Sequence, residues 1–219
     1  MNGLFVWDIQ NIATPPRWRG FVIRANINNQ NYNLRNMSRK YKFKNPEGVY
    51  FISFSVLNWV DALTRSEYKD IFIKNLAYCQ EHKGLDIFAW CIMSNHVHLI
   101  IRAQNGSGLE GILRDYKKFT SKAIIQAIKE NPVESRREWL LEQFKSKDGF
   151  TFWQGDNHPI ELWSNEVIDQ KLRYIHQNPV EEGLVFRAED YRYSSACDYA
   201  GENGMLDILV IESWYGQRY

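Results

Sequence analysis

The stretch that decides the fold reads WCIMSNHVHLII and covers residues 90–101. Apolar residues flank a Ser-Asn turn signal and two histidines one residue apart. Side chains on a β-strand alternate between two faces, so His96 and His98 share one face while Val97 lies on the other. Two adjacent imidazoles can hold one divalent ion, although an exposed strand face carrying two histidines by chance would show the same pattern. The stretch therefore predicts a hairpin with a candidate metal site on its second strand.

The hairpin lies within an alternation of helical and strand patterns. The chain predicts, in order, a buried strand (49–56), a helix (65–82), the two hairpin strands (85–92 and 96–102) and a second helix (109–129). This β-α-β-β-α order predicts an α+β fold, namely a ferredoxin-like antiparallel sheet with helices on one face. The histidine pair is expected on a central strand of that sheet.

The second half of the domain continues with shorter elements. A helix is predicted at 134–144, short strands at 150–154 and 159–163, and a further helix from Asn165 to Asn178. Ser164 is a suitable N-cap for that last helix, and Pro179 is expected to end it.

The chain is expected to consist of one domain with an extension at each end. Residues 1–36 contain an Asn-rich run and no sustained period, which predicts an irregular N-terminal extension. Met37 offers an alternative biological start, so the extension need not be native. The main domain is assigned to 37–200 and a C-terminal tail to 201–219.

Composition narrows the class of protein. The net charge is only +1, so any nucleic-acid partner must be inferred from local patches, while the 15% aromatic content suits stacking on unpaired bases. The three cysteines are far apart and lack metal-ligand spacing, as expected of reduced thiols. No signal peptide is visible, and no apolar run approaches the ~20 residues of a membrane-spanning helix. We expect a cytoplasmic protein without a membrane partner.

A basic stripe follows the helix predicted at 109–129. Its members recur at i, i+3, i+4, i+7 and i+8, and they are Arg114, Lys117, Lys118, Ser121 and Lys122. Such a stripe can follow a phosphate backbone, which makes its cations candidate DNA-binding residues. An ordinary solvated helix face would have the same composition.

The helix predicted from Asn165 carries a second polar group. Tyr174 lies off the apolar face and shares its side with Lys171, Gln177 and Asn178 at spacings of three and four. A phenol, an ammonium and a carboxamide thus converge near the end of the helix. Taken alone, the segment is equally compatible with an ordinary half-buried tyrosine.

These motifs together resemble a known family. His96-Val97-His98, followed by Leu99-Ile100-Ile101, resembles the HUH motif, in which U is an apolar residue. Residues 173–180, RYIHQNPV, resemble the nucleophile helix of single-tyrosine HUH transposases, and residues 191–196, YRYSSA, resemble a short segment near their C-terminus. The likeness is to the insertion-sequence-like and REP-associated tyrosine transposase branches, and it covers about residues 38–200.

The resemblance implies a reaction and its residues. Mg²⁺ or Mn²⁺ would be held by His96, His98 and Asn178, with Gln177 as a competing ligand because a residue before proline is biased away from helical geometry. Tyr174 would attack a DNA phosphodiester and form a covalent 5′-phosphotyrosine. The substrate would be single-stranded DNA beside a hairpin, bound through Arg114, Lys117, Lys118, Lys122 and Lys171.

The resemblance leaves other readings open. The same chemistry serves replication initiators and relaxase-like nickases, and a domesticated or catalytically silent relative would only bind DNA hairpins. Insertion-sequence relatives are often homodimers that exchange the tyrosine helix, whereas the REP-associated branch tends to be monomeric. The long insertion between Lys129 and Trp163 favours the REP-associated branch, and the sequence leaves both a monomer and a homodimer open.

Overall fold

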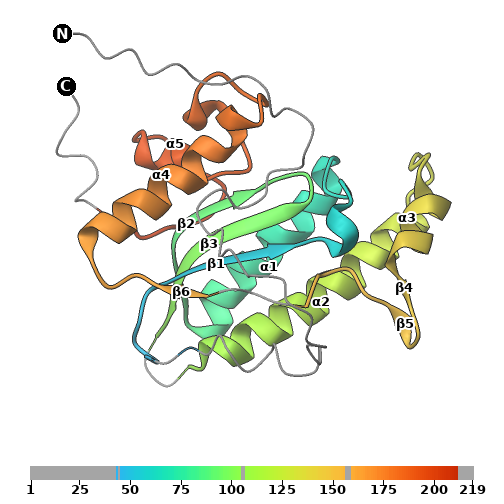
Figure 1. Cartoon of the computed structure of the whole chain (residues 1–219), viewed down its shortest axis with the longest axis horizontal. Coiled ribbons are helices and arrows are strands. Elements are labelled where there is room, and N and C mark those ends of the chain that lie inside the picture. Colours follow the sequence, from blue (N-terminus) through green and yellow to red (C-terminus); the bar gives the residue numbers. More distant parts are fainter. Residues whose placement is uncertain (1–42, 44, 105–106, 156–158, 212–219) are drawn as a thin grey trace, which may run out of the picture. The chain divides into compact units, whose positions relative to one another are not determined.

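The computed structural model describes residue 43 and residues 45–104, 107–155 and 159–211, all within one compact unit, Met37–Tyr219. The predicted extension, residues 1–36, lies outside the described residues. The elements follow the order β1 (Tyr50–Ser55), η2 (Leu57–Trp59), α1 (Ser66–Lys83), β2 (Leu85–Ile92), β3 (His96–Ala103), α2 (Leu109–Glu130), α3 (Arg137–Phe144), β4 (Lys145–Ser146), β5 (Gly149–Phe150), β6 (Ile160–Glu161), α4 (Asn165–Glu181), η3 (Ala188–Asp190) and α5 (Ala196–Tyr199) (Figure 1).

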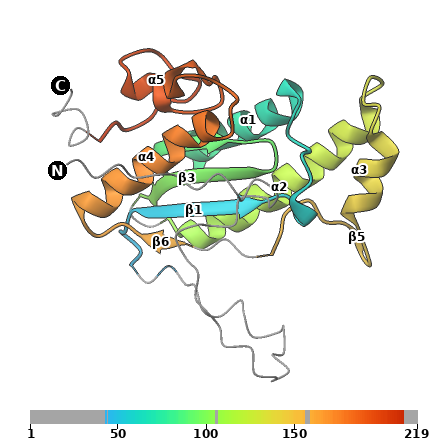
Figure 2. The same cartoon turned by 45° about the horizontal axis from the view of Figure 1, so that its top comes forward.

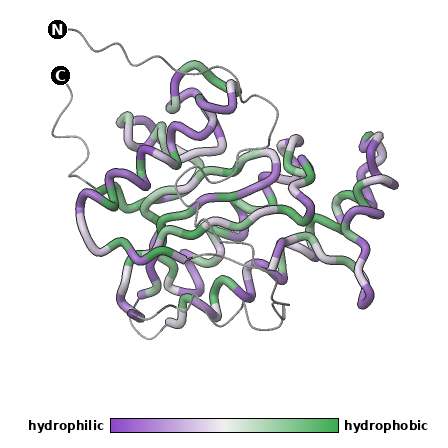
Figure 3. The backbone as a smooth tube through the Cα atoms, in the orientation of Figure 1, coloured by the Kyte–Doolittle hydropathy of each residue, from purple (hydrophilic) through white to green (hydrophobic). Residues whose placement is uncertain are grey.

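The main sheet confirms the predicted α+β fold and its hairpin. Its four strands are antiparallel and lie in the order β2-β3-β1-β6, so β3 is a central strand. His98 on β3 lies opposite Ser53 of β1 and Cys91 of β2. The hydrophobic residues concentrate along these strands (Figure 3). Both histidines are therefore held on a rigid, doubly flanked strand.

The two faces of the sheet carry different helices. On one face Phe54 of β1 contacts Tyr116 of α2, with ring centroids 6.1 Å apart, and α1 packs beside α2 on this side (Figures 1 and 2). Helices on one face were predicted, and α1 and α2 follow that prediction. The histidine face, however, is covered by α4, whose Asn178 reaches His98. The prediction was incomplete because residues on both faces of β3 are buried, so the histidine face is covered as well.

The end of α4 differs from the prediction. The helix continues through Pro179 to Glu181, and Asn178 retains its place inside the helix. Proline removes one helical hydrogen bond, but Asn178 and Pro179 are both buried, and the Pro179 carbonyl accepts a bond from the Leu184 N–H at 2.9 Å. Burial against the sheet thus outweighs the local preference of a residue that precedes proline.

Short elements after α2 also depart from the predicted pattern. Within residues 150–154 and 159–163, the strands are limited to Phe150 at the end of β5 and to β6, which adds an edge to β1. The predicted helix at 134–144 begins only at Arg137, because Glu134 lies in a turn where its buried carboxylate binds two arginines.

The C-terminal residues extend the domain beyond the predicted boundary at 200. The Ser195 N–H donates to the Trp90 carbonyl at 2.9 Å, and the Leu209 N–H donates to the Ile87 carbonyl at 2.9 Å. Both bonds are made to β2, whose outer edge would otherwise present unpaired backbone groups. Residues 201–211 therefore pack onto the sheet edge rather than forming a separate tail, while 212–219 lie outside the described residues.

Candidate active site on the histidine face

The histidine pair lies under cover at the centre of the sheet. His96 and His98 project from the same face of β3, with ring centroids 4.7 Å apart, and their exposed fractions are 7% and 1%. Phe51 of β1 stacks beside His98 at a centroid distance of 5.6 Å. The two rings are thus fixed close together by the strand and by their neighbours.

Burial favours the neutral form of both imidazoles. Burial lowers the pKa of His96 to about 4, with Asn178 and Asp61 acting weakly in the opposite direction. The pKa of His98 lies well below its usual range because of burial, followed by the nearby His96 and Lys171. A neutral imidazole keeps a lone pair on one ring nitrogen, which is the form that binds metals.

Tyr174 of α4 stands over the same face. Its ring centroid lies 5.0 Å from that of His98 and 6.0 Å from that of Phe51. Burial raises the pKa of the phenol, and a hydrogen bond with Asn178 acts in the opposite direction. Lys171, one turn earlier, places its Nζ 4.8 Å from the Phe51 ring centroid and 5.7 Å from the Tyr174 ring centroid. The tyrosine and a cation therefore meet above the histidines.

Asn178 links the helix to the strand. Because it lies four residues after Tyr174, it falls on the same side of α4, and its Nδ2 is 3.3 Å from His98 Nε2. Gln177, the competing ligand in the sequence, is exposed. The structure brings His96, His98, Tyr174 and Asn178 together, whereas Gln177 is exposed to solvent.

A third buried histidine, His176 of α4, lies apart from this pair. His176 Nε2 lies 2.9 Å from Ser195 Oγ, and its ring centroid is 4.9 Å from that of Tyr199. Burial lowers its pKa to about 4. His176 thus joins α4 to the C-terminal segment, on a different side of the helix from Tyr174.

A family model, Transposase IS200 like, matches residues 58–178, which span every group just described on β3 and α4. The chain belongs to this family. A REP-associated tyrosine transposase of Haemophilus influenzae is 26% identical over 153 residues, covering 68% of this chain and 79% of the relative. A solved REP-associated tyrosine transposase, bound to a REP hairpin, is 18% identical with a TM-score of 0.57, covering 84% of this chain and 99% of that one. This second likeness shows a shared fold.

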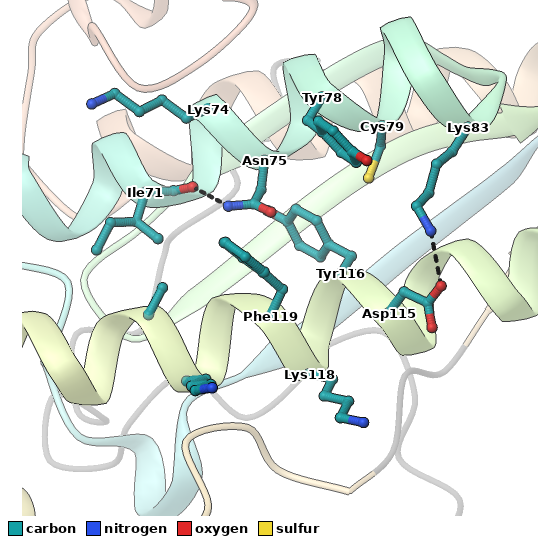
Figure 4. Close-up of a pocket in the computed structure, with 12 residues that line it drawn as sticks. Ile71, Lys74, Asn75, Tyr78, Cys79, Lys83, Asp115, Tyr116, Lys118 and Phe119 are labelled. Carbon is teal, nitrogen blue, oxygen red and sulfur yellow. Dashed lines mark hydrogen bonds and ion pairs between the residues drawn. The ribbon is translucent and has the colours of Figure 1, made fainter.

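The basic residues of α2 lie away from the histidine face of this IS200-like transposase. Lys118 and Lys122 line a groove of about 810 Å³ between α1 and α2, where Phe119 is also exposed (Figure 4). Lys117 donates to the Gln154 carbonyl at 3.1 Å, and Arg114 contacts Asp115 at 3.5 Å. Of the five cations predicted to contact DNA, the structure therefore places Lys171 beside Tyr174 and the other four on the α2 side.

Few side chains of this transposase that could bind a metal lie near the histidine pair in the part of the chain that the structure describes. Within the described ranges, no three His, Cys, Asp or Glu side chains gather as a metal cluster. Asn178 adds a carboxamide beside the histidine pair, with its Nδ2 3.3 Å from His98 Nε2. Among the same residues no helix is long and apolar enough to cross a membrane.

Several residues near the site were missed by sequence reasoning. Phe51 was recognised only as a strand residue, although alternation from Ser53 would have placed it on the histidine face. Trp59 lies with its ring centroid 5.9 Å from that of His96, at the end of a short turn where Asn58 and Trp59 both have positive φ. Asp61 accepts hydrogen bonds from the two side chains of the turn before His96. No local pattern connects a residue near position 60 with the hairpin, because the contact is tertiary.

Proposed function

We propose that this transposase cleaves and rejoins single-stranded DNA beside hairpins, with Tyr174 as the nucleophile and with a divalent ion held by His96, His98 and Asn178. The observation that carries the proposal is the convergence of one phenol, two neutral imidazoles and one carboxamide on a single buried face. A purely structural role would not require two adjacent neutral histidines under a tyrosine. The proposal extends the family membership to a mechanism for this chain.

The residues present fit a divalent ion. Both imidazoles are neutral, so ion binding would not have to displace protons from charged rings. The Asn178 side chain already touches His98, and rotation of its amide would present Oδ1 in place of Nδ2. We assign Mg²⁺ or Mn²⁺, which accept carboxamide and phosphate oxygens. When bound, the ion would polarise the scissile phosphate as a Lewis acid.

The chain's own groups define the covalent step. The Tyr174 Oη–phosphorus bond forms while the bond from phosphorus to the 3′ oxygen breaks, which yields a 5′-phosphotyrosine and a 3′-hydroxyl. The phenol gives up a proton and the 3′ oxygen gains one, so the proton count is unchanged. Burial keeps the phenol protonated until attack, and the nearby Lys171 ammonium favours the negative charge that develops. Rejoining reverses the same step with another 3′-hydroxyl.

Two further observations support a substrate and an oligomeric state for this proposal. A relative of the same fold binds a REP hairpin, which supports hairpin DNA as the ligand here. Tyr174 stands over His98 of its own chain at 5.0 Å between ring centroids, so one chain can supply the complete set of groups. We therefore propose that the protein acts as a monomer.

Cleavage of a labelled single-stranded hairpin library with Mn²⁺ or Mg²⁺ tests the proposal. The wild type should form a protein–DNA adduct that survives denaturation, and Tyr174→Phe should form none. Tyr78→Phe is the matched control, because Tyr78 is an exposed tyrosine of α1 on the other side of the sheet. An adduct that persists in Tyr174→Phe would contradict the proposal. Hairpin binding without any adduct would favour a silent DNA-binding protein.

A further inference from the structure

The turn between β2 and β3 is connected to a carboxylate outside the hairpin. Asp61 Oδ1 accepts hydrogen bonds from Ser94 Oγ at 2.7 Å and from Asn95 Nδ2 at 2.8 Å. The other end of the same amide, Asn95 Oδ1, lies 2.7 Å from Nδ1 of His96. Asp61, Asn95 and His96 therefore form a continuous chain of hydrogen bonds that ends at the histidine pair.

The direction of this chain follows from donor and acceptor chemistry. An ionised carboxylate only accepts hydrogen bonds, so the group that Asn95 turns towards Asp61 must be its NH₂. The Asn95 carbonyl oxygen then faces His96, and since it also only accepts, the imidazole must carry its proton on Nδ1. The lone pair of the neutral ring is thereby placed on Nε2, the nitrogen remote from Asn95. Asp61 thus favours one tautomer of a ring two hydrogen bonds away, while a hydrogen bond with Asn178 also acts on that ring.

We propose that Asp61 is a positioning residue that holds His96 in the Nδ1–H tautomer through Asn95 and so keeps Nε2 available for a divalent ion. The role of Asp61 in metal binding rests on the proposed function, whereas the His96 tautomer can be observed without any metal. It assigns a role to a residue on the loop before α1, far along the sequence from both the histidines and Tyr174. Partners of this outer kind tune the orientation and basicity of metal-binding histidines.

Main-chain hydrogen bonds hold the residues of this hydrogen-bond chain in place. The Val56 N–H donates to the Asn95 carbonyl, and the Leu63 N–H donates to the Ser94 carbonyl, both at 2.7 Å. Arg136 Nη1 donates to the Asp61 carbonyl at 2.9 Å. The turn and the Asp61 loop are thus fixed to each other by main-chain bonds, so a change in the Asp61 side chain can alter the tautomer without displacing the loop.

Asp61→Asn tests the inference because it keeps the shape of the side chain and adds a donor. An amide at position 61 can donate to Asn95 Oδ1, which lets the Asn95 amide invert and present NH₂ to His96 Nδ1. The proton then moves to Nε2, where it blocks metal binding. In metal-free protein, ¹⁵N NMR of the His96 ring should show the Nδ1–H form in the wild type and a mixture in Asp61→Asn.

The affinity for Mn²⁺ provides the second measurement, and Ser94→Ala provides the matched control. Asp61→Asn should weaken Mn²⁺ binding about 10-fold. Ser94→Ala removes the other bond to Asp61 Oδ1 but retains the bond from Asn95, so the tautomer should be kept and the affinity should change less than about twofold. The same tautomer in wild type and Asp61→Asn, or an equal loss in Ser94→Ala, would overturn the inference. A wild type that shows the Nδ1–H form and forms no DNA adduct would contradict the proposed function alone.

Discussion

Two buried polar clusters of this transposase are organised in opposite ways. In the first, which we call the Glu134 cluster, the carboxylate of Glu134 accepts from Arg65 Nε at 2.8 Å, from Arg136 Nε at 3.2 Å and from the Tyr68 hydroxyl at 3.3 Å. Burial alone would raise the pKa of Glu134, but the bonds from Arg136 and Arg65 outweigh it and lower the pKa to about 2. The one buried carboxylate of this cluster is therefore paired with two arginines.

The second cluster, on the histidine face, contains neutral rings instead of paired charges. His96 and His98 lie 4.7 Å apart, and the groups packed against them are a phenol, a carboxamide and aromatic rings. Asp61 is linked to His96 by hydrogen bonds through Asn95, and its charge opposes the lowering of the His96 pKa by burial. Removing one partner of a buried ion pair is strongly destabilising, whereas neutral donors gathered on one face are suited to a cation and an anionic substrate.

The largest effect is expected from His98→Gln, which breaks the histidine cluster. Loss of one metal-binding imidazole should reduce the rate of adduct formation roughly 1,000-fold, since a metal ion contributes several kcal/mol to charge stabilisation. The free energy of unfolding should fall by less than for Glu134→Gln, because this substitution removes no ion pair. Gel assays measure adduct formation, and urea unfolding measures stability. A large loss of stability with intact adduct formation would show that His98 serves the fold rather than the reaction.

For Glu134→Gln we expect the opposite pattern, namely a loss of stability with little change in Mn²⁺ affinity. The folded-state pKa of about 2 lies below the ordinary value of 4.5, so the carboxylate stabilises the fold above pH 4.5 and loses that contribution as the pH falls towards 2. Removing the charge should lower the free energy of unfolding at neutral pH by about 3 kcal/mol. Mn²⁺ affinity of the folded protein should change less than about threefold. A variant as stable as the wild type would show that the pairing does not stabilise the fold.

A smaller effect separates His176 from the histidine pair. Its folded-state pKa of about 4 lies below the ordinary 6.5, so the unfolded chain takes up a proton first as the pH falls, and stability decreases between pH 6.5 and pH 4. Going from about pH 7.5 to about pH 5, this histidine should account for about 2 kcal/mol of the loss, which His176→Gln should remove. Urea unfolding at both pH values tests this, and an unchanged pH dependence in the variant would refute it.

The smallest effect is expected from replacing a single lysine, and it concerns the salt dependence of DNA binding. Lys171→Gln should lower the slope of log affinity against log salt for single-stranded DNA by about 0.7, as expected for one lost phosphate contact. Lys118→Gln on α2 is the control, because Lys118 lies on the other side of the sheet from Tyr174. An equal decrease in both variants would show that DNA also contacts the α2 side.

Local signals accounted for the parts of the fold that were predicted correctly. Residues 65–82 and 109–129 repeat apolar side chains at helical spacing, and Gly84 ends α1 in a left-handed conformation with φ of 64°. The prediction failed where distant residues compete with local preference. Pro179 was expected to end α4, yet burial of that turn against the sheet carries the helix to Glu181.

The sequence by itself determined the order of elements, the hairpin, the shared face of His96 and His98, and the shared side of Tyr174 and Asn178, because these depend on periods of two and about 3.6 residues along one segment. Only the tertiary structure decided that α4 covers the histidine face, that Asn178 rather than Gln177 meets His98, that the α2 cations lie on the other side, and that Asp61 reaches the turn before His96. Those placements depend on which surfaces are buried against each other, and packing between distant segments leaves no periodic signal in the chain.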